Sequence, residues 1–216
     1  MFIFGVIFAL VAGILFGLIG PTTKIAYNSG ASVALTIFLR YAVASIIILP
    51  FIPYQNNLLE IFKKNLKYFL SISAGSIFLT LGLLTSVIFI EVSLTILIFC
   101  LYPIYVLLFS IIIDKEKISL IVKILFFVTF LGIVLVIGPS FKVINIVGIL
   151  LAFLASLGST SMIIVNQKMS IKGISPIPIN IFINVFNTIF FFVILKIFFS
   201  LNFNFDINIY LLILIH

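Results

Sequence analysis

The chain has 216 residues, of which 64% are hydrophobic and 8% are charged, and its mean hydropathy is +1.50. Soluble domains are about half apolar and about a quarter charged, so this composition excludes an ordinary water-soluble protein. The formal net charge is +7, but the basic residues are scattered over short loops, and this pattern argues against a nucleic-acid partner.

Long apolar runs follow one another along the chain and predict a polytopic, all-α membrane protein. A spanning helix takes about 20 mostly apolar residues, because the hydrocarbon layer is about 30 Å thick and every backbone polar group must be bonded within the segment. In chain order, the runs predict seven full transmembrane helices, at roughly Phe2 to Ile19, Ser32 to Phe51, Tyr68 to Ile88, Val92 to Ile113, Leu120 to Ile137, Ile144 to Val165 and Ile177 to Phe199. A further run of ten residues, Ile207 to His216, predicts a partial eighth helix that stops about halfway across the bilayer.

Proline residues mark the expected ends of several of these helices. Because proline has no N–H and its ring clashes with the preceding turn, it favours the ends of helices over their interiors. Gly20-Pro21 follows the first span, and Gly138-Pro139 follows the fifth. Pro50 and Pro53 lie at the end of the second span, and Pro176 and Pro178 lie at the start of the seventh. Pro103 instead lies in the middle of the fourth span, where it predicts a kink.

The lysine residues predict which helix ends face the cytoplasm. Cytoplasmic loops of membrane proteins carry an excess of lysine and arginine. With a cytoplasmic N-terminus, the inner loops hold seven lysines and the outer loops two: Lys63, Lys64, Lys67, Lys115, Lys117, Lys168 and Lys172 inside, and Lys24 and Lys142 outside. We therefore expect a multi-pass protein of the cytoplasmic (inner) membrane with its N-terminus in the cytoplasm.

A faint internal repeat divides the chain into two units. When the chain is aligned with itself at a shift of 143 or 144 residues, four identical pairs and one pair of polar residues coincide. They are Gly5 with Gly148, Ala9 with Ala152, Ala12 with Ala155, Lys24 with Lys168, and Arg40 with Asn184. Five spans separate the copies, and an odd number reverses the second copy, as in transporters built from inverted repeats. The repeat predicts a complete five-helix bundle over residues 1–138 and an incomplete inverted copy over residues 144–216.

Four short stretches carry a family resemblance. They are Phe16-Gly17 with Lys24, Arg40 in the second span, Ser86 to Ser93 followed by Tyr102-Pro103, and the loop Asp114-Lys115-Glu116-Lys117-Ile118-Ser119. In this order and at these spacings they resemble the EamA-type branch of the drug/metabolite transporter superfamily. Phe16 stands where that family has tryptophan, Asp114-Lys115 replaces its usual small residues, and the second copy stops less than halfway. The resemblance implies a ten-helix fold with cytoplasmic termini and a substrate cavity between the two halves.

Arg40 is the most unusual side chain in the predicted spans. It lies eight residues into the second span, about 12 Å deep, where an ionised side chain costs at least about 2.5 kcal/mol unless it is paired or hydrated. One hypothesis is that Arg40 faces the cavity and binds an anionic substrate or tunes the potential of the cavity. The alternative is that it reaches the interface or bonds backbone carbonyls and holds helices in register.

Other polar residues are candidates for lining the substrate cavity or for bonding neighbouring helices. Glu91 opens the fourth span, where its carboxylate either faces the positive helix end or pairs with Arg40 or Lys24. Thr80, Thr85, Ser86, Tyr102 and Tyr105 lie near the Pro103 kink, and Asn180, Asn184 and Asn187 share one face of the seventh span. Lys24 and Glu116 are motif residues expected in loops, Glu116 as an element that sets topology or locks its loop.

Small residues recur every three to four positions in two of the spans. They are Gly5, Ala9, Ala12, Gly13 and Gly17 in the first span, and Gly148, Ala152, Ala155 and Gly158 in the sixth. In membranes such patterns allow two helix backbones to approach closely. They predict tight helix packing at both places.

The sequence offers no catalytic or metal-binding set. His216 is the only histidine, Cys100 is the only cysteine, and neither a His-Glu-x-x-His nor a Gly-x-Ser-x-Gly motif is present. We therefore expect no enzyme activity, no metal and no cofactor. We predict a secondary transporter, a permease or exporter, that moves a small organic metabolite across the lipid bilayer by alternating access, with a homodimer as a candidate assembly. The alternative is a non-transporting, truncated membrane fragment or assembly subunit that packs against a partner.

Overall fold

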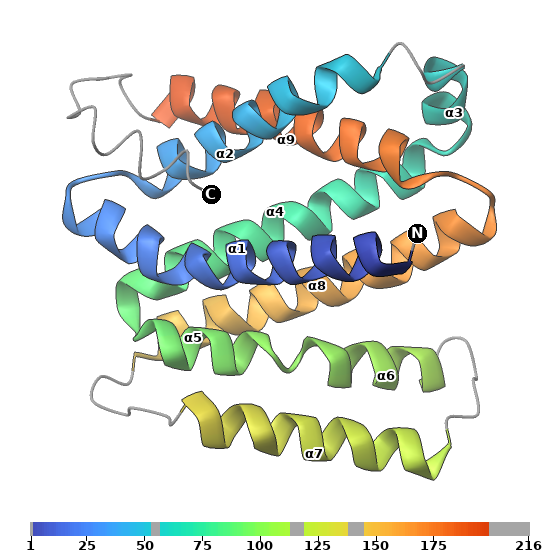
Figure 1. The fold of residues 1–216 in the computed structure, drawn as a ribbon. Helices are drawn as coiled ribbons and strands as arrows, with labels where there is room; N and C mark the ends of the chain where they lie inside the picture. The colour runs from blue at the N-terminus through green and yellow to red at the C-terminus, as the bar shows by residue number, and fades with distance from the viewer. Residues whose placement is uncertain (1, 53–56, 113–118, 138–144, 199–216) are drawn as a thin grey trace.

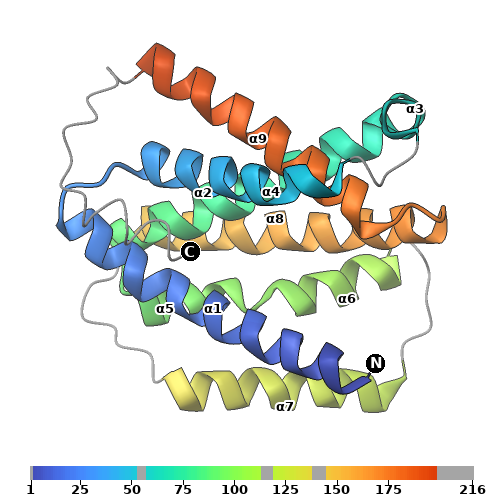
Figure 2. The same ribbon diagram turned by 45° about the horizontal axis from the view of Figure 1, so that its top comes forward.

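The computed structural model describes residues 2–52, 57–112, 119–137 and 145–198, which fold almost entirely into helices. Consecutive long helices run back and forth and lie roughly side by side (Figures 1 and 2). In chain order they are α1 (Phe2–Asn28), α2 (Val33–Ile48), the short 3₁₀ turn η1 (Leu49–Phe51), α3 (Leu58–Lys64), α4 (Leu66–Phe89), α5 (Val92–Phe99), α6 (Tyr102–Ile112), α7 (Leu120–Ile137), α8 (Ile146–Ile171) and α9 (Pro176–Phe198). The predicted all-helical architecture is confirmed.

Five described helical stretches are long and apolar enough to cross a membrane: Gly5–Asn28, Leu66–Phe89, Val92–Ile112, Ile146–Ile171 and Pro176–Ile197. α2 and α7 add two shorter apolar helices. Large apolar side chains are exposed along them, with Phe8 at 71% and Leu135 at 81%, as expected for surfaces that face lipid rather than water. The protein is therefore a multi-pass membrane protein. The predicted partial eighth helix, Ile207 to His216, lies outside the described residues.

The tightest packing joins α4 to α8, which lie side by side (Figures 1 and 2). A Cβ atom added at Gly82 would lie 2.5 Å from the carbonyl oxygen of Leu151, and one added at Gly158 would lie 2.5 Å from the backbone nitrogen of Leu79. Ala155, also in this seam, is fully buried. Only small residues permit such an approach of two backbones, and the packing predicted for the small residues of the sixth span is confirmed.

The same packing prediction is wrong for α1. No atom lies within 4 Å of a Cβ added at Gly5, Gly13 or Gly17, and the neighbouring Phe8 and Ile14 side chains are exposed. A small-residue pattern indicates which face permits close contact, but the contact also needs a second helix. None of the helices that the structure describes comes within contact distance of a Cβ added at these three glycines.

α1 also continues through Gly20-Pro21, where the sequence predicted its end. Pro21 leaves the Gly17 carbonyl without its helical donor, and the Thr22 hydroxyl donates to the next carbonyl, that of Leu18, at 2.6 Å. The helix ends at Asn28 and is followed by Gly30, whose φ of +93° favours glycine because a Cβ would be strained there.

The other proline positions agree better with the prediction. Pro50 lies in η1 directly after α2, and Pro176 is the first residue of α9. Pro178 lies in the first turn of α9, where a missing N–H costs little because it would have no helical partner. Pro53 and Gly138-Pro139 lie outside the described residues.

Candidate functional site

A pocket of about 240 Å³ opens where α1, α4, α5 and the start of α6 meet. Most of the side chains around it are apolar, and Thr95, Cys100 and Tyr102 are the polar ones among the lining residues that the structure describes. The lining residues are Phe16, Gly17, Ile19, Gly20, Leu83, Leu84, Val87, Val92, Thr95, Ile96, Phe99, Cys100 and Tyr102. We call this cavity the α1–α4–α5 pocket.

The pocket lies beside a break in the fourth predicted span, which the structure divides into α5 and α6. Pro103 has no N–H, so the Phe99 carbonyl lacks the donor that a regular helix would supply four residues later. The backbone instead tightens, with the Leu101 N–H donating to the Ile98 carbonyl at 3.1 Å and the Ile104 N–H to the Leu101 carbonyl at 2.9 Å. The predicted kink at Pro103 is thus a full interruption of the helix at Cys100 and Leu101.

Aromatic rings and a bond from α8 hold the two sides of this break in place. The Phe99 ring lies 6.1 Å from that of Phe16 in α1 and 5.2 Å from that of Tyr102 in α6, measured between centroids. On the opposite side, the Thr160 hydroxyl of α8 is 3.3 Å from the Tyr102 carbonyl. The break is therefore supported by contacts with both α1 and α8.

Two hydroxyl groups mark the α4–α5 side of the pocket. The Ser86 hydroxyl of α4 donates to the carbonyl of Leu83 at 2.8 Å, and its oxygen lies 3.2 Å from the Thr95 hydroxyl oxygen of α5. Ser86 is fully buried, and Thr95 is almost fully buried. Ser86 therefore acts on the pocket through Thr95, which lines it directly.

Lys24 connects α1 to the end of α4 near the same pocket. Its ammonium Nζ donates to the Val87 carbonyl at 2.8 Å, and Val87 lines the pocket. Val87 belongs to the last turn of α4, where carbonyls lack helical donors and the helix dipole favours a positive charge. The sequence placed Lys24 in a loop, whereas the structure places it within α1.

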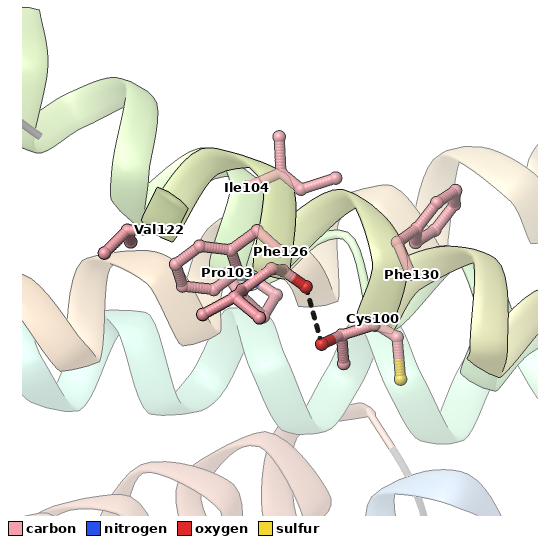
Figure 3. A pocket seen from close by; sticks show the side chains of 8 residues that line it. Cys100, Pro103, Ile104, Val122, Phe126 and Phe130 are labelled. Carbon is pink, nitrogen blue, oxygen red and sulfur yellow. Dashed lines mark hydrogen bonds between the residues drawn. The ribbon is translucent and has the colours of Figure 1, made fainter. Parts of the chain in front are cut away.

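A second apolar cavity of about 280 Å³ lies on the α7 side of the same break (Figure 3). Cys100, Pro103 and Ile104 line it from the break, and Phe126 and Phe130 line it from α7. The hydrogen bond drawn there is internal to α7, from the Thr129 hydroxyl to the Leu125 carbonyl at 2.8 Å. Cys100 lines both cavities, so the break is bordered by unfilled space on two sides.

Arg40 lies outside both cavities. It is half-buried on α2, and the hydroxyl-bearing rings of Tyr27 in α1 and Tyr41 in α2 are close enough to interact with it electrostatically. The Tyr27 hydroxyl is buried and has no hydrogen-bond partner. Arg40 thus has tyrosine neighbours from both α1 and α2.

A buried polar cluster connects α2, α4 and α9. The Tyr41 hydroxyl is 2.7 Å from the hydroxyl oxygens of both Ser76 and Thr80. The amide nitrogen of Asn187, a fully buried residue of α9, donates to the Ser76 hydroxyl at 3.1 Å. Asn187 therefore bonds neighbouring helices, which is one of the two roles that its sequence pattern left open.

The other predicted asparagines bond within their own helix. Asn180 is exposed and donates to the Pro176 carbonyl at 3.1 Å, and Asn184 is half-buried and donates to the Asn180 carbonyl at 2.9 Å. The three asparagines thus differ in burial from exposed to fully buried. A position on one helical face does not make them one site.

The remaining candidates are dispersed. Tyr105 packs edge-on against Phe153 of α8, at 5.5 Å between ring centroids. Glu91 occupies the position before α5, as predicted, but its side chain forms no capping hydrogen bond. Thr85 is half-buried on α4 and does not belong to the pocket lining. Glu116 lies outside the described residues.

Sequence reasoning missed Thr95 and Ser76, which connect helices in the two polar clusters. Thr95 lies only nine residues after Ser86, so a turn between two antiparallel helices brings them together. Ser76 and Asn187 are 111 residues apart, and nothing local in the sequence indicates their contact. Among the described residues, no group of three or more His, Cys, Asp or Glu side chains is placed to hold a metal ion.

Comparison with known families matches residues 3–138 to the EamA-like transporter family. The matched region covers more than half of the chain and contains every residue that lines the α1–α4–α5 pocket. No curated protein and no solved structure gives a significant match.

Proposed function

Because the chain belongs to the EamA-like transporter family, whose members are membrane transporters and not enzymes, we propose that it moves a small organic molecule across the cytoplasmic membrane by alternating access. The observation that carries this proposal is the α1–α4–α5 pocket, where Phe16, Gly17 and Tyr102 of the family-like stretches line one cavity beside a helix break. Interrupted helices are a recurrent feature of binding sites in secondary transporters.

We also propose an inverted repeat, which would suit alternating access. The hydroxyl oxygens of Ser45 in α2 and Thr188 in α9, two residues 143 positions apart, lie 3.0 Å from each other, and 143 is an offset of the sequence repeat. Residues related by a two-fold axis meet only near that axis. α2 packs along α9, and α1 runs opposite to its repeat partner α8 (Figure 1). We therefore propose two inverted units, residues 1–138 and 144–216, about an axis between α2 and α9.

We propose seven membrane crossings on the basis of the same arrangement. α1, α2, α4, the α5–α6 pair, α7, α8 and α9 run in alternating directions (Figure 1). The described lysines of the predicted inner loops then gather at one side, next to the N-terminal end of α1: Lys63, Lys64, Lys67, Lys168 and Lys172. By the excess of basic residues in cytoplasmic loops, this side and the N-terminus are cytoplasmic.

The break between α5 and α6 is suited to a moving part of such a transporter. At Phe99 the helix has lost a backbone hydrogen bond, and the cavities on both sides of Cys100 leave room for α6 to tilt against α5. Tilting would open or close the α1–α4–α5 pocket, because Phe99 and Tyr102 line it from either side of the break. Discontinuous helices act in this way when one half of a transporter moves against the other.

The lining of the pocket restricts the substrate. Apolar side chains make up most of it, and neither a lysine nor Arg40 lines it. Its volume of about 240 Å³ lies below the roughly 300–1,000 Å³ of typical ligand sites. We propose a small molecule with an apolar part, oriented by the hydroxyl groups of Thr95 and Tyr102.

Transport by purified protein in liposomes tests the proposal, with a panel of radiolabelled amino acids, sugars and nucleosides and the amphiphilic dye ethidium as probes. Gly17→Leu fills the pocket without a backbone clash, because no atom lies within 4 Å of an added Cβ. Gly13→Leu is the matched control, since Gly13 is equally open, lies on the same helix and does not line the pocket. We expect Gly17→Leu to lower flux of the transported probe at least tenfold and Gly13→Leu to leave it within twofold.

Equal flux in the two variants would remove the pocket from the transport route. Absence of flux for every probe, in well-folded wild-type protein, would instead favour the alternative of a non-transporting fragment or assembly subunit. Size-exclusion chromatography of both variants establishes that a loss of flux is not a loss of fold.

A further inference from the structure

A polar pocket of about 700 Å³ lies at the opposite end of α4 from the transport pocket, between α3 and the turn that joins α8 to α9. It shares no residue with the α1–α4–α5 pocket. Its lining residues are Asn57, Glu60, Ile61, Lys64 and Asn65 on one side, and Lys172, Gly173, Ile174, Ser175 and Pro178 on the other. We call it the lysine pocket.

Packing and hydrogen bonds fix the α3 side of the lysine pocket. The Phe62 ring of α3 lies 4.9 Å from that of Phe69 in α4 and 5.3 Å from that of Phe182 in α9, between centroids. Asn65 joins α3 to α4, and its amide donates to the Ile61 carbonyl at 3.2 Å. α3 is therefore held against two long helices, although it has only seven residues.

The α8–α9 side is fixed by the end of α8. The Gly173 N–H donates to the Ser170 carbonyl at 2.9 Å, and the Ile174 N–H donates to the Met169 carbonyl at 3.1 Å. These bonds, with a φ of +75° at Gly173, form a Schellman motif, which ends a helix with a defined backbone shape. Both sides of the lysine pocket are thus fixed by contacts within the protein.

The charge around the lysine pocket is strongly positive. Lys64 and Lys172 line it from opposite sides, whereas Glu60 is the acidic residue among the lining residues that the structure describes. The Lys172 ammonium lies 4.0 Å from the centroid of the Tyr68 ring, which limits its movement. Further positive charge comes from Lys63 in α3, Lys67 at the start of α4 and Lys168 in the last turn of α8.

We propose that the lysine pocket binds a phosphate group, with Lys64 and Lys172 as its charged contacts. Lysines on facing sides supply positive charge for an anion, and Asn65 and Ser175 add an amide and a hydroxyl donor. Leu59 and Ile171 are each adjacent in sequence to a lining residue, and their side chains are 75% and 78% exposed. These exposed apolar side chains favour the phosphate of an anionic lipid over that of a soluble molecule. Basic pockets at the ends of membrane helices bind such headgroups, while the exposed apolar side chains contact acyl chains.

Native mass spectrometry of the full chain in detergent tests the proposal. Dissociation constants are measured for phosphatidylglycerol, for phosphatidylcholine and for soluble glycerol 3-phosphate. We expect Lys64→Gln and Lys172→Gln each to weaken phosphatidylglycerol binding at least about tenfold, because each substitution removes a hydrogen bond between charged groups. Lys63→Gln is the matched control, because it removes the same charge from the neighbouring residue, which does not line the pocket, and we expect a change below about threefold.

Each outcome of this experiment has a definite meaning. Lipid binding that depends on Lys64 and Lys172 supports a lipid-headgroup site, and glycerol 3-phosphate binding with the same dependence and no lipid preference supports a site for soluble phosphate esters. Lys64→Arg keeps the charge and should retain binding. The proposal would be overturned if Lys63→Gln and Lys64→Gln weakened phosphatidylglycerol binding equally. It would also be overturned if the protein bound phosphatidylglycerol no more tightly than phosphatidylcholine and did not bind glycerol 3-phosphate.

Discussion

Substitution of Gly82 by alanine perturbs the close approach of α4 and α8, on which the fold depends most. The added Cβ would lie 2.5 Å from the Leu151 carbonyl oxygen and 2.7 Å from the Ala155 nitrogen, both of them backbone atoms. Ordinary contact begins near 3.4 Å, so the two helices must separate by roughly 0.9 Å and lose dispersion contacts along the seam. A flexible side chain could turn aside, but these backbone atoms cannot.

The magnitude follows from a comparison with Gly13→Ala. Alanine is favoured over glycine in a helix by about 1 kcal/mol, and this gain is common to both variants. Gly13 has open space around it, whereas Gly82 is overpacked by the change, at a cost of about 1–3 kcal/mol. The difference between the two variants therefore isolates the packing cost, and we expect Gly82→Ala to be about 1–3 kcal/mol less stable than Gly13→Ala.

The assay is reversible unfolding in mixed micelles, in which the free energy of unfolding is measured as the fraction of denaturing detergent rises. Circular dichroism follows the loss of helix, and all variants are prepared in the same micelles. If Gly82→Ala and Gly13→Ala have the same free energy of unfolding, the two backbones do not approach as closely as the structure places them, and the reasoning fails.

Two further predictions concern charged residues in the helices. Lys24→Met removes the bond to the Val87 carbonyl and should lower the free energy of unfolding by about 1.5–3 kcal/mol, whereas Lys196→Met, at an exposed position near the end of α9, should change it little; equal effects would contradict the assigned bond. Arg40→Gln should reduce the amount of folded protein in the membrane, because Arg40 interacts with Tyr27 and Tyr41 and lies outside the pocket. A folded Arg40→Gln protein that has lost only transport would place Arg40 at the substrate instead.

The helices themselves could be predicted from the sequence because apolar length is a local property. Every predicted full span has a helix in the structure, and Pro50 and Pro176 lie at helix ends as predicted. Gly20-Pro21 was predicted wrongly, because α1 continues through it to Asn28 although Pro21 removes one helical hydrogen bond. Pro103 had a larger effect than a kink, because the bonds on both sides of it shift to a tighter pattern.

Contacts between helices were harder to predict, because a residue pattern describes one surface and a contact needs two. The small residues of α8 meet α4, while Gly5, Gly13 and Gly17 of α1 have no atom within 4 Å of an added Cβ. Similarly, Phe16, Gly17 and Tyr102 meet at one pocket, whereas Arg40, Tyr105 and Asn187 each have other neighbours. The family-like stretches located the pocket better than polarity did, since the pocket is mostly apolar.

The central claim is that substrate passes through the α1–α4–α5 pocket beside the helix break. Cys100 is the only cysteine of the chain and lines that pocket as well as the cavity on the α7 side, so its rate of alkylation by N-ethylmaleimide reports whether a bound molecule closes off the helix break in the unmodified protein. The most direct measurement is this rate in liposomes, with and without a saturating concentration of the probe that shows flux. The account predicts that the transported probe slows alkylation of Cys100 at least fivefold, while probes that are not transported leave it unchanged. An alkylation rate that the transported probe does not alter would contradict the account.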